Sequence, residues 1–253
     1  MNEVFSTTYT GDKNAIKNCI AQFDSSGKNF DVRNRNSLKL FEVDGKTINI
    51  KSFKKPNYIN RVVYRFFRPS KAERSFTYAH KLLEKGISTP QPIAYFEKHT
   101  FLGFGNSFYV SEHLNYDLTY RELIGDSQYE GNESILKAFA AFTYSLHCKG
   151  IHFLDHSAGN TLIKIKENGT YDFYLVDLNR MEFGKLDYKT RIKNFERLSK
   201  IEAHIKVTAG SYATLSGDSP EEVYEDMKRY ALDYQMRFRR KKRWKKRFKF
   251  WGK

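Results

Sequence analysis

The chain has 253 residues, 40% of them hydrophobic and 16% aromatic, which is enough apolar material for one large domain or two lobes and excludes global disorder. Lysine and arginine number 44, and eleven of them fall in residues 237–253, where no acidic residue occurs. The 33 other cations exceed the 29 acidic residues by only four, so the net charge of +15 comes mainly from a C-terminal tail.

The sequence contains little that indicates export or membrane insertion. The two cysteines, Cys19 and Cys148, do not have metal-ligand spacing and suit a reducing compartment. The first 25 residues are interrupted by charges and contain no apolar core, so we expect no signal peptide. No uncharged apolar run approaches the ~20 residues that a membrane-spanning helix needs. We therefore expect a cytosolic protein, with peripheral attachment to a membrane left open.

The first half of the chain predicts strands around one helix. Asp44-Gly45 is a typical two-residue turn and lies between two strand-like runs, which predicts a hairpin. Apolar side chains at helical spacing predict a helix over 71–85, which Gly86 ends. The strands are expected at 37–41, 47–53, 93–96 and 107–112.

The second half predicts mainly helices. They are expected at 119–124, at 132–149 and through most of the chain beyond a second hairpin, formed by 161–166 and 171–176 around Asn168-Gly169. This order predicts an α+β fold with a small sheet-rich lobe to about residue 114 and a larger helical lobe over 115–236. The basic tail, 237–253, follows this 1–236 domain.

One loop carries residues that suit phosphoryl transfer. Asp155 and Asn160 stand five residues apart between the second helix and the hairpin, and the hairpin ends at Asp177. Phosphoryl transfer needs a divalent cation to neutralise the phosphates and a carboxylate to orient the acceptor hydroxyl. Asparagine and aspartate offer the oxygen ligands that Mg²⁺ prefers. Each residue alone also fits an ordinary hydrogen-bonded turn, but the combined spacing is that of a kinase catalytic loop.

Several stretches resemble the bacterial Kdo/lipopolysaccharide-core kinase family of the protein-kinase-like superfamily. They are IKSFK at 50–54, YRFFRPSKA at 64–72, GISTPQPIAY at 86–95 and FLDHSAGNTLI at 153–163. The resemblance runs from about residue 27 to 200 and implies a bilobal protein-kinase-like fold. It also implies ATP-dependent phosphorylation of a sugar hydroxyl, typically of the Kdo of the lipid A inner core. The place it implies is the cytoplasmic face of the inner membrane of a Gram-negative bacterium.

The resemblance also implies roles for individual residues. Asp155 takes the place of the catalytic aspartate, and Lys51 takes that of the lysine on the α/β-phosphates of ATP. Asn160 and Asp177 take the two Mg²⁺-ligand positions. In the hinge, Glu112 and Leu114 offer backbone groups to adenine.

Other parts of the family pattern are changed. No Gly-x-Gly-x-x-Gly is present, and Gly27 with residues 34–36 is the candidate replacement. The helix glutamate that should pair with Lys51 is either Glu73 or missing, since Ser75 occupies the expected position. In the family pattern the metal-binding aspartate is usually followed by Phe-Gly, whereas here Asp177 is followed by Leu178 and Asn179. Asparagine tolerates the left-handed conformation that such a turn needs.

Two alternatives remain open from the sequence. One is a small-molecule kinase of the aminoglycoside or choline type. The other is a pseudokinase or binding module that docks on a membrane or on nucleic acid through the tail. The tail interleaves cations with aromatic residues, and we expect an anionic membrane surface as its partner ahead of nucleic acid. The oligomeric state is not indicated.

Overall fold

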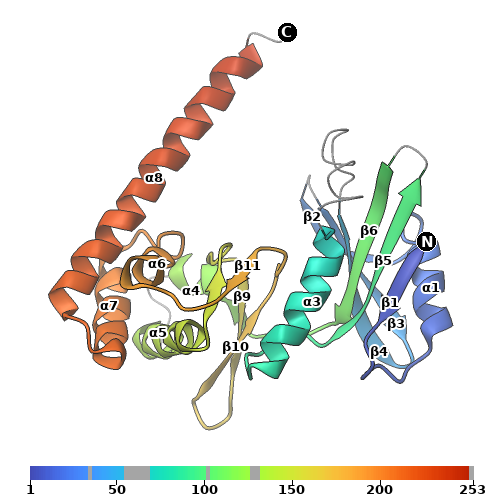
Figure 1. Cartoon of the computed structure of the whole chain (residues 1–253), viewed down its shortest axis with the longest axis horizontal. Coiled ribbons are helices and arrows are strands. Elements are labelled where there is room, and N and C mark those ends of the chain that lie inside the picture. The colour runs from blue at the N-terminus through green and yellow to red at the C-terminus, as the bar shows by residue number, and fades with distance from the viewer. Residues whose placement is uncertain (34–35, 54–68, 101–102, 126–131, 251–253) are drawn as a thin grey trace. The chain divides into compact units, whose positions relative to one another are not determined.

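Six antiparallel strands form the sheet of the first of two structural units, which consists of residues 1–115 and 175–180. The computed structural model describes residues 1–33, 36–53, 69–100, 103–125 and 132–250. The strand order is β1–β5–β6–β4–β3–β2 (Figure 1). The strands are β1 Asn2–Phe5, β2 Lys28–Arg33, β3 Asn36–Val43, β4 Lys46–Phe53, β5 Pro92–Thr100 and β6 Gly103–Glu112.

The β3–β4 hairpin confirms the first predicted turn. Val43 pairs with Lys46 across the two-residue loop. Asp44 and Gly45 have φ values of 52° and 71°, the left-handed conformation that a tight hairpin turn requires. The turn fixes the register of β4 and thereby the face of the sheet to which each of its side chains points.

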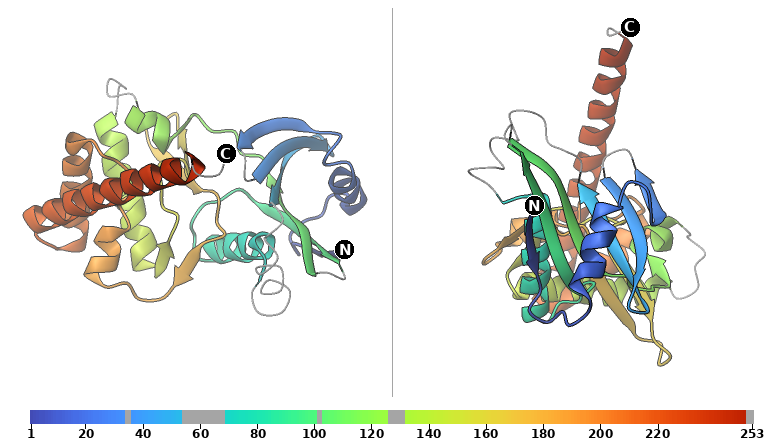
Figure 2. Two further views of the ribbon diagram at one scale, coloured as in Figure 1. Left: turned by 90° about the horizontal axis from the view of Figure 1, so that it is seen from above. Right: turned by 90° about the vertical axis from the view of Figure 1, so that its right-hand side faces the viewer.

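Helices cover both faces of this sheet, as the view from above shows (Figure 2). On one face, α1 (Lys13–Ala21) buries Ile16 and Ile20 against Ile48 and Ile50 of β4. On the other face, α3 (Lys71–Glu84) packs Ala72 and Phe76 against Phe53, Tyr95 and Tyr109. Because side chains alternate along a strand, Lys51 points to the α3 face with Phe53, whereas Ile48 and Ile50 point to the α1 face.

The second unit, residues 116–174 and 181–253, is mainly helical. Its helices are α4 Tyr120–Gly125, α5 Asn132–Cys148, α6 Tyr188–Lys193, α7 Glu202–Ser216 and α8 Pro220–Phe250. Its strands are β7 Leu118–Thr119, β8 Ile151–Phe153, β9 Thr161–Ile165, β10 Tyr171–Leu175 and β11 Met181–Phe183. They form the small sheets β10–β9–β7 and β11–β8. The core lies where α5, α7 and α8 meet, around Phe139, Tyr212 and Met227.

The predicted helices over 71–85, 119–124 and 132–149 and the second hairpin are confirmed to within one or two residues. Two N-terminal elements, β1 and α1, were not predicted. The exposed edge strand β1 has no alternating burial, and α1 buries only two apolar residues. The resembling residues 64–68 and the phosphate-loop residues 34–35 lie outside the described residues.

The tail is helical where the structure describes it. Helix α8 continues without a break past Arg237 to Phe250, since lysine and arginine are good helix formers. Val223, Met227 and Ala231 bury its first half in the core of its unit. From Met236 to Lys245 every side chain is exposed, and this half extends away from the other helices of the unit (Figure 1). Among the described residues, no helix is long and apolar enough to cross a membrane.

Candidate active site

The loop between β8 and β9 holds Asp155 and Asn160 together within the second unit. Two tight turns shape it, with the His156 N–H donating to the Phe153 carbonyl at 3.0 Å and the Asn160 N–H to Ser157 at 2.9 Å. The Asn160 side-chain amide donates to the backbone carbonyl of Asp155 at 2.9 Å. The nitrogen of that amide is therefore used within the loop, and its oxygen is the end suited to a cation.

Arg197 binds the Asp155 carboxylate and was not predicted as a site residue. Its guanidinium pairs with Asp155 Oδ1 and also donates to the Leu154 carbonyl at 3.4 Å. The guanidinium carbon lies 5.7 Å from the ring centre of Tyr234 in α8. Burial lowers the pKa of Arg197, but hydrogen bonds to Asp155 and Tyr234 outweigh this and raise that pKa overall. Arg197 lies 42 residues after Asp155 in the chain, and no sequence motif links the two residues. The sequence therefore did not indicate this contact.

A buried hydrogen-bond network supports the same loop. The Asn194 side chain donates to the Phe153 carbonyl at 2.9 Å, and its oxygen accepts from His147 Nε2 at 3.2 Å. His147 Nδ1 accepts from the Tyr212 hydroxyl at 2.8 Å, and Arg191 donates to that hydroxyl. His147 is thus a neutral imidazole, and burial lowers its pKa to about 4. The network fixes a backbone carbonyl two residues before Asp155.

A second unpredicted arginine lies against the loop. The guanidinium of Arg121, in α4, occupies the space next to Gly159, where an added Cβ would collide with it. Glycine at this position therefore lets a cation approach the backbone directly before Asn160. In the sequence, the glycine at position 159 is the one feature that could have indicated this close approach of Arg121.

In the first unit, Lys51 and Asp177 form an ion pair of 2.7 Å. The turn that carries Asp177 is held at Leu175, whose N–H donates to the Ser88 carbonyl at 3.0 Å and whose carbonyl accepts from the Thr89 hydroxyl at 2.7 Å. The structure thus brings together two of the predicted residues, 126 positions apart in the chain.

The turn differs from its predicted form. Asp177 itself has the left-handed φ of 60°, whereas Asn179 does not. The expectation that Asn179 takes this conformation is wrong. Asn179 instead donates its side-chain amide to Asp177 Oδ1 at 2.7 Å, which stabilises the carboxylate in the strained turn.

Within the described residues, the carboxylate paired with Lys51 is that of Asp177. Glu73 lies in the first turn of α3, and its N–H is capped by Ser70. Burial and the nearby charge of Glu97 raise the pKa of Glu73, a shift opposite to that of a carboxylate paired with lysine. The Ser75 hydroxyl donates to the Lys71 carbonyl.

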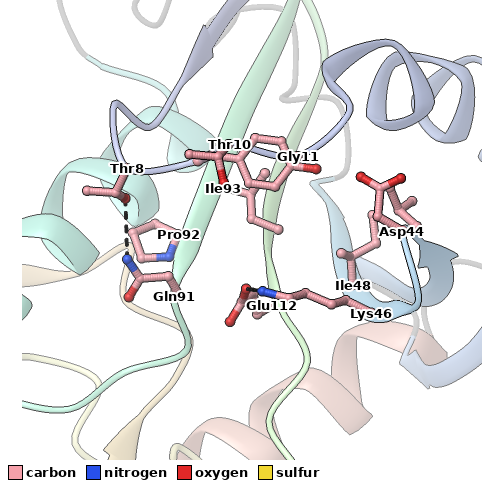
Figure 3. Close-up of a pocket in the computed structure, with 12 residues that line it drawn as sticks. Thr8, Thr10, Gly11, Asp44, Lys46, Ile48, Gln91, Pro92, Ile93 and Glu112 are labelled. Atoms are coloured by element: carbon pink, nitrogen blue, oxygen red, sulfur yellow. Dashed lines mark hydrogen bonds and ion pairs between the residues drawn. The ribbon is translucent and has the colours of Figure 1, made fainter.

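The hinge candidates lie at the end of β6. The Glu112 N–H donates to Gln91 at 2.9 Å, so adenine could meet only the carbonyl of this residue. The Glu112 side chain pairs with Lys46 at 2.9 Å and lines a cavity of about 170 Å³ (Figure 3). The cavity also contains Ile48 and therefore lies on the α1 face of the sheet. Lys51 points to the other face, so this cavity is separate from the Lys51–Asp177 pair. The Leu114 backbone follows β6 directly.

Asp177 in the first unit and Asn160 in the second each offer an oxygen donor of the kind that magnesium prefers. No group of three or more His, Cys, Asp or Glu side chains suited to a metal occurs in the part of the chain that the structure describes. Magnesium usually takes one or two carboxylates and completes its shell with waters and phosphate oxygens. The Asp177 carboxylate and the Asn160 amide oxygen are of the required kind.

Comparison with known proteins gives a matching family model and similar solved structures. The model of the lipopolysaccharide kinase (Kdo/WaaP) family matches residues 33–217. The solved structure "WaaP in complex with acyl carrier protein" has a TM-score of 0.62 and 16% identity, over 95% of this chain and 99% of that chain. The Rio2 kinase of Chaetomium thermophilum gives a TM-score of 0.47 and 17% identity, over 88% of this chain and 75% of that chain. No curated protein sequence matches significantly.

Proposed function

The chain belongs to the lipopolysaccharide kinase (Kdo/WaaP) family, and on that premise we propose that it transfers the γ-phosphoryl group of ATP to a hydroxyl of Kdo in the lipid A inner core. The family match confirms the predicted family and the predicted class of enzyme, a kinase acting on a lipopolysaccharide sugar. The likeness to WaaP confirms the predicted kinase-like fold. Kdo as the acceptor, Mg²⁺ and the residue roles are the proposal.

The Lys51–Asp177 ion pair supports the nucleotide half of the proposal most directly. The family resemblance implies separate roles for these two residues, one at the phosphates and the other at the metal, and their side chains lie 2.7 Å apart in one unit. Lys51 neutralises the Asp177 carboxylate. Lys51 would hold the α/β-phosphates of ATP, and Asp177 would hold the Mg²⁺ ion. Bound Mg²⁺ would neutralise charge on the phosphates.

The acceptor half is the loop of Asp155. Its carboxylate orients the sugar hydroxyl and takes its proton, while the Asn160 amide oxygen would supply a metal ligand. Arg197 keeps the carboxylate in one orientation, and an oriented carboxylate is what proton transfer from a hydroxyl needs. In the hinge, the Glu112 carbonyl and the Leu114 N–H are the groups offered to adenine.

The second half of α8 is proposed to bind the anionic inner leaflet on which the lipid-linked acceptor lies. The exposed residues 237–245 include Arg239, Arg240, Lys241, Lys242 and Arg243 in succession. At 100° per residue, the five consecutive cations 239–243 surround the helix, so this stretch has no apolar face. Its attraction to a membrane is therefore mainly electrostatic, about 1 kcal/mol for each cation near the surface.

Vesicle co-sedimentation tests the role of α8. The matched variant replaces the cations at 239–243 with glutamine and keeps Arg237, whose guanidinium binds Glu196 at 2.5 Å. Wild type should bind anionic vesicles at low salt and release them at high salt, and the variant should bind weakly at both. Equal binding of the two proteins, or a preference of wild type for single-stranded nucleic acid at physiological salt, would refute the membrane assignment.

An acceptor panel with radiolabelled ATP tests the activity. Kdo-lipid A should be phosphorylated, whereas an aminoglycoside and choline should not, and Asp155→Asn is the inactive control. Phosphorylation of a small molecule in preference to Kdo-lipid A would favour the small-molecule kinase. Failure of wild type to bind nucleotide at all would favour a pseudokinase.

A further inference from the structure

The segment 194–197, here called the bridging segment, contacts the catalytic loop and helix α8 at the same time. Toward the loop, Asn194 donates to the Phe153 carbonyl, and Arg197 binds the Leu154 carbonyl and the Asp155 carboxylate. These contacts hold three consecutive loop residues. The buried side chain of Phe195 anchors the segment in the core of the second unit.

Toward α8, the same segment uses two charged contacts. Glu196 accepts from Arg237 at 2.5 Å, and the Arg197 guanidinium lies over the Tyr234 ring at 5.7 Å. Tyr234 stacks in turn on Phe238, with ring centres 6.2 Å apart. Tyr234 and Arg237 lie one turn apart, where the buried half of α8 ends and the exposed basic half begins. One face of the guanidinium is thus covered by α8 while its edge binds Asp155.

We propose that Arg197 is a positioning residue for Asp155 and that Tyr234 of α8 holds Arg197 in place. The proposal rests on the assignment of Asp155 as the catalytic carboxylate. A guanidinium has many rotamers, and a ring packed over its face selects one of them, so the carboxylate bound to its edge is oriented as well. Helix α8 thereby acts on the reaction from outside the catalytic loop.

The chain offers a matched control on the same helix. Arg229 binds the Asp226 carboxylate and lies 5.0 Å from the Tyr230 ring centre, the same three chemical groups without a contact to the catalytic loop. Arg229→Ala and Tyr230→Leu therefore remove equivalent interactions and should leave turnover unchanged.

Kinetics of the variants give the first test. Arg197→Ala should lower kcat by about 10²-fold, the scale of a misplaced catalytic group, and leave the KM for ATP unchanged. Added guanidinium ion should restore part of kcat in Arg197→Ala, and Arg197→Lys should be intermediate. Tyr234→Leu should lose about fivefold, which corresponds to a cation–π contact of about 1 kcal/mol, whereas Tyr234→Phe keeps the ring and should lose less. An unchanged kcat in Arg197→Ala, or a loss without guanidinium rescue, would overturn the proposal.

Hydrogen exchange gives a second test that needs neither acceptor nor turnover. The amides of His156 and Asn160 are hydrogen-bonded within the loop, so peptides covering 153–160 report its order. Tyr234→Leu should speed exchange in these peptides, and Tyr230→Leu should not. Unchanged exchange in Tyr234→Leu would refute the coupling even in an active enzyme. Faster exchange in a protein that phosphorylates no acceptor would support the coupling and refute only the proposed function.

Discussion

Lowering the pH from 7 to 5 should reduce the free energy of unfolding by about 4 kcal/mol, because two histidines are buried as neutral rings. Burial lowers the pKa of His147 to about 4 and that of His156 to about 3. In the unfolded chain both pKa values are near 6.5. As the pH falls below 6.5, the two histidines bind protons in the unfolded chain but not in the folded chain. The free energy of unfolding therefore decreases until the pH reaches the pKa values of the folded state. At pH 5 each ring contributes about 2 kcal/mol of that loss.

The rings have no compensating partner for a second proton. His147 already uses both nitrogens, donating to Asn194 and accepting from Tyr212, so protonation of Nδ1 would oppose the Tyr212 hydroxyl hydrogen. His156 stacks on Phe139 with ring centres 5.5 Å apart, and its Nδ1 is buried without a hydrogen-bond partner among the described residues. Both rings lie buried in the interior of the second unit.

Urea unfolding at pH 7 and pH 5 measures the effect. Far-UV circular dichroism is the suitable signal, since the exposed Trp244 near the end of α8 does not report on the core. His147→Gln cannot take up the proton and should lose about half of the pH dependence. A wild-type loss below about 1 kcal/mol, or an unchanged loss in His147→Gln, would refute the neutral buried rings.

Three further predictions concern the site. Asp155→Asn should lower kcat by at least ~10²-fold while ATP still raises Tm, and near-normal turnover would exclude a catalytic role. Asp177→Ala should abolish the Mg²⁺-dependent part of the ATP-induced Tm increase, and a wild type without such a part would refute the metal role. Gly159→Ala should displace Arg121 and lower kcat to the level of Arg121→Ala. The double variant should have the same kcat as either single variant, whereas additive losses would show that the two residues act separately.

Much of the secondary structure was predictable because it depends on local patterns. The Asp44-Gly45 turn allows only a tight hairpin, and this places Lys51 on the α3 face. The apolar stripes of α3 and α5 determined those helices in the same way. The helical conformation of the tail was not predicted, since its run of cations was interpreted as a membrane-binding segment and gave no sign that α8 would continue through it.

The functional residues also fall into those that local sequence patterns indicate and those that only tertiary packing brings to the site. Asp155, Asn160 and Asp177 were found because the catalytic-loop spacing is local in sequence, and their roles remain predictions. Arg197 and Arg121 were not found, since only tertiary packing brings them to the loop. The sequence left the partner of Lys51 open, as Glu73 or none, because tertiary contacts of Ser88 and Thr89 with Leu175 hold the Asp177 turn within reach of the lysine.

Mass spectrometry of the lipid A–core from cells lacking the gene tests the central claim most directly. Cells complemented with the wild-type gene should carry one additional phosphate on Kdo, and cells complemented with Asp155→Asn should not, at equal protein levels. An unchanged lipid A–core in cells with and without the wild-type gene, or a phosphate added equally by Asp155→Asn, would contradict it.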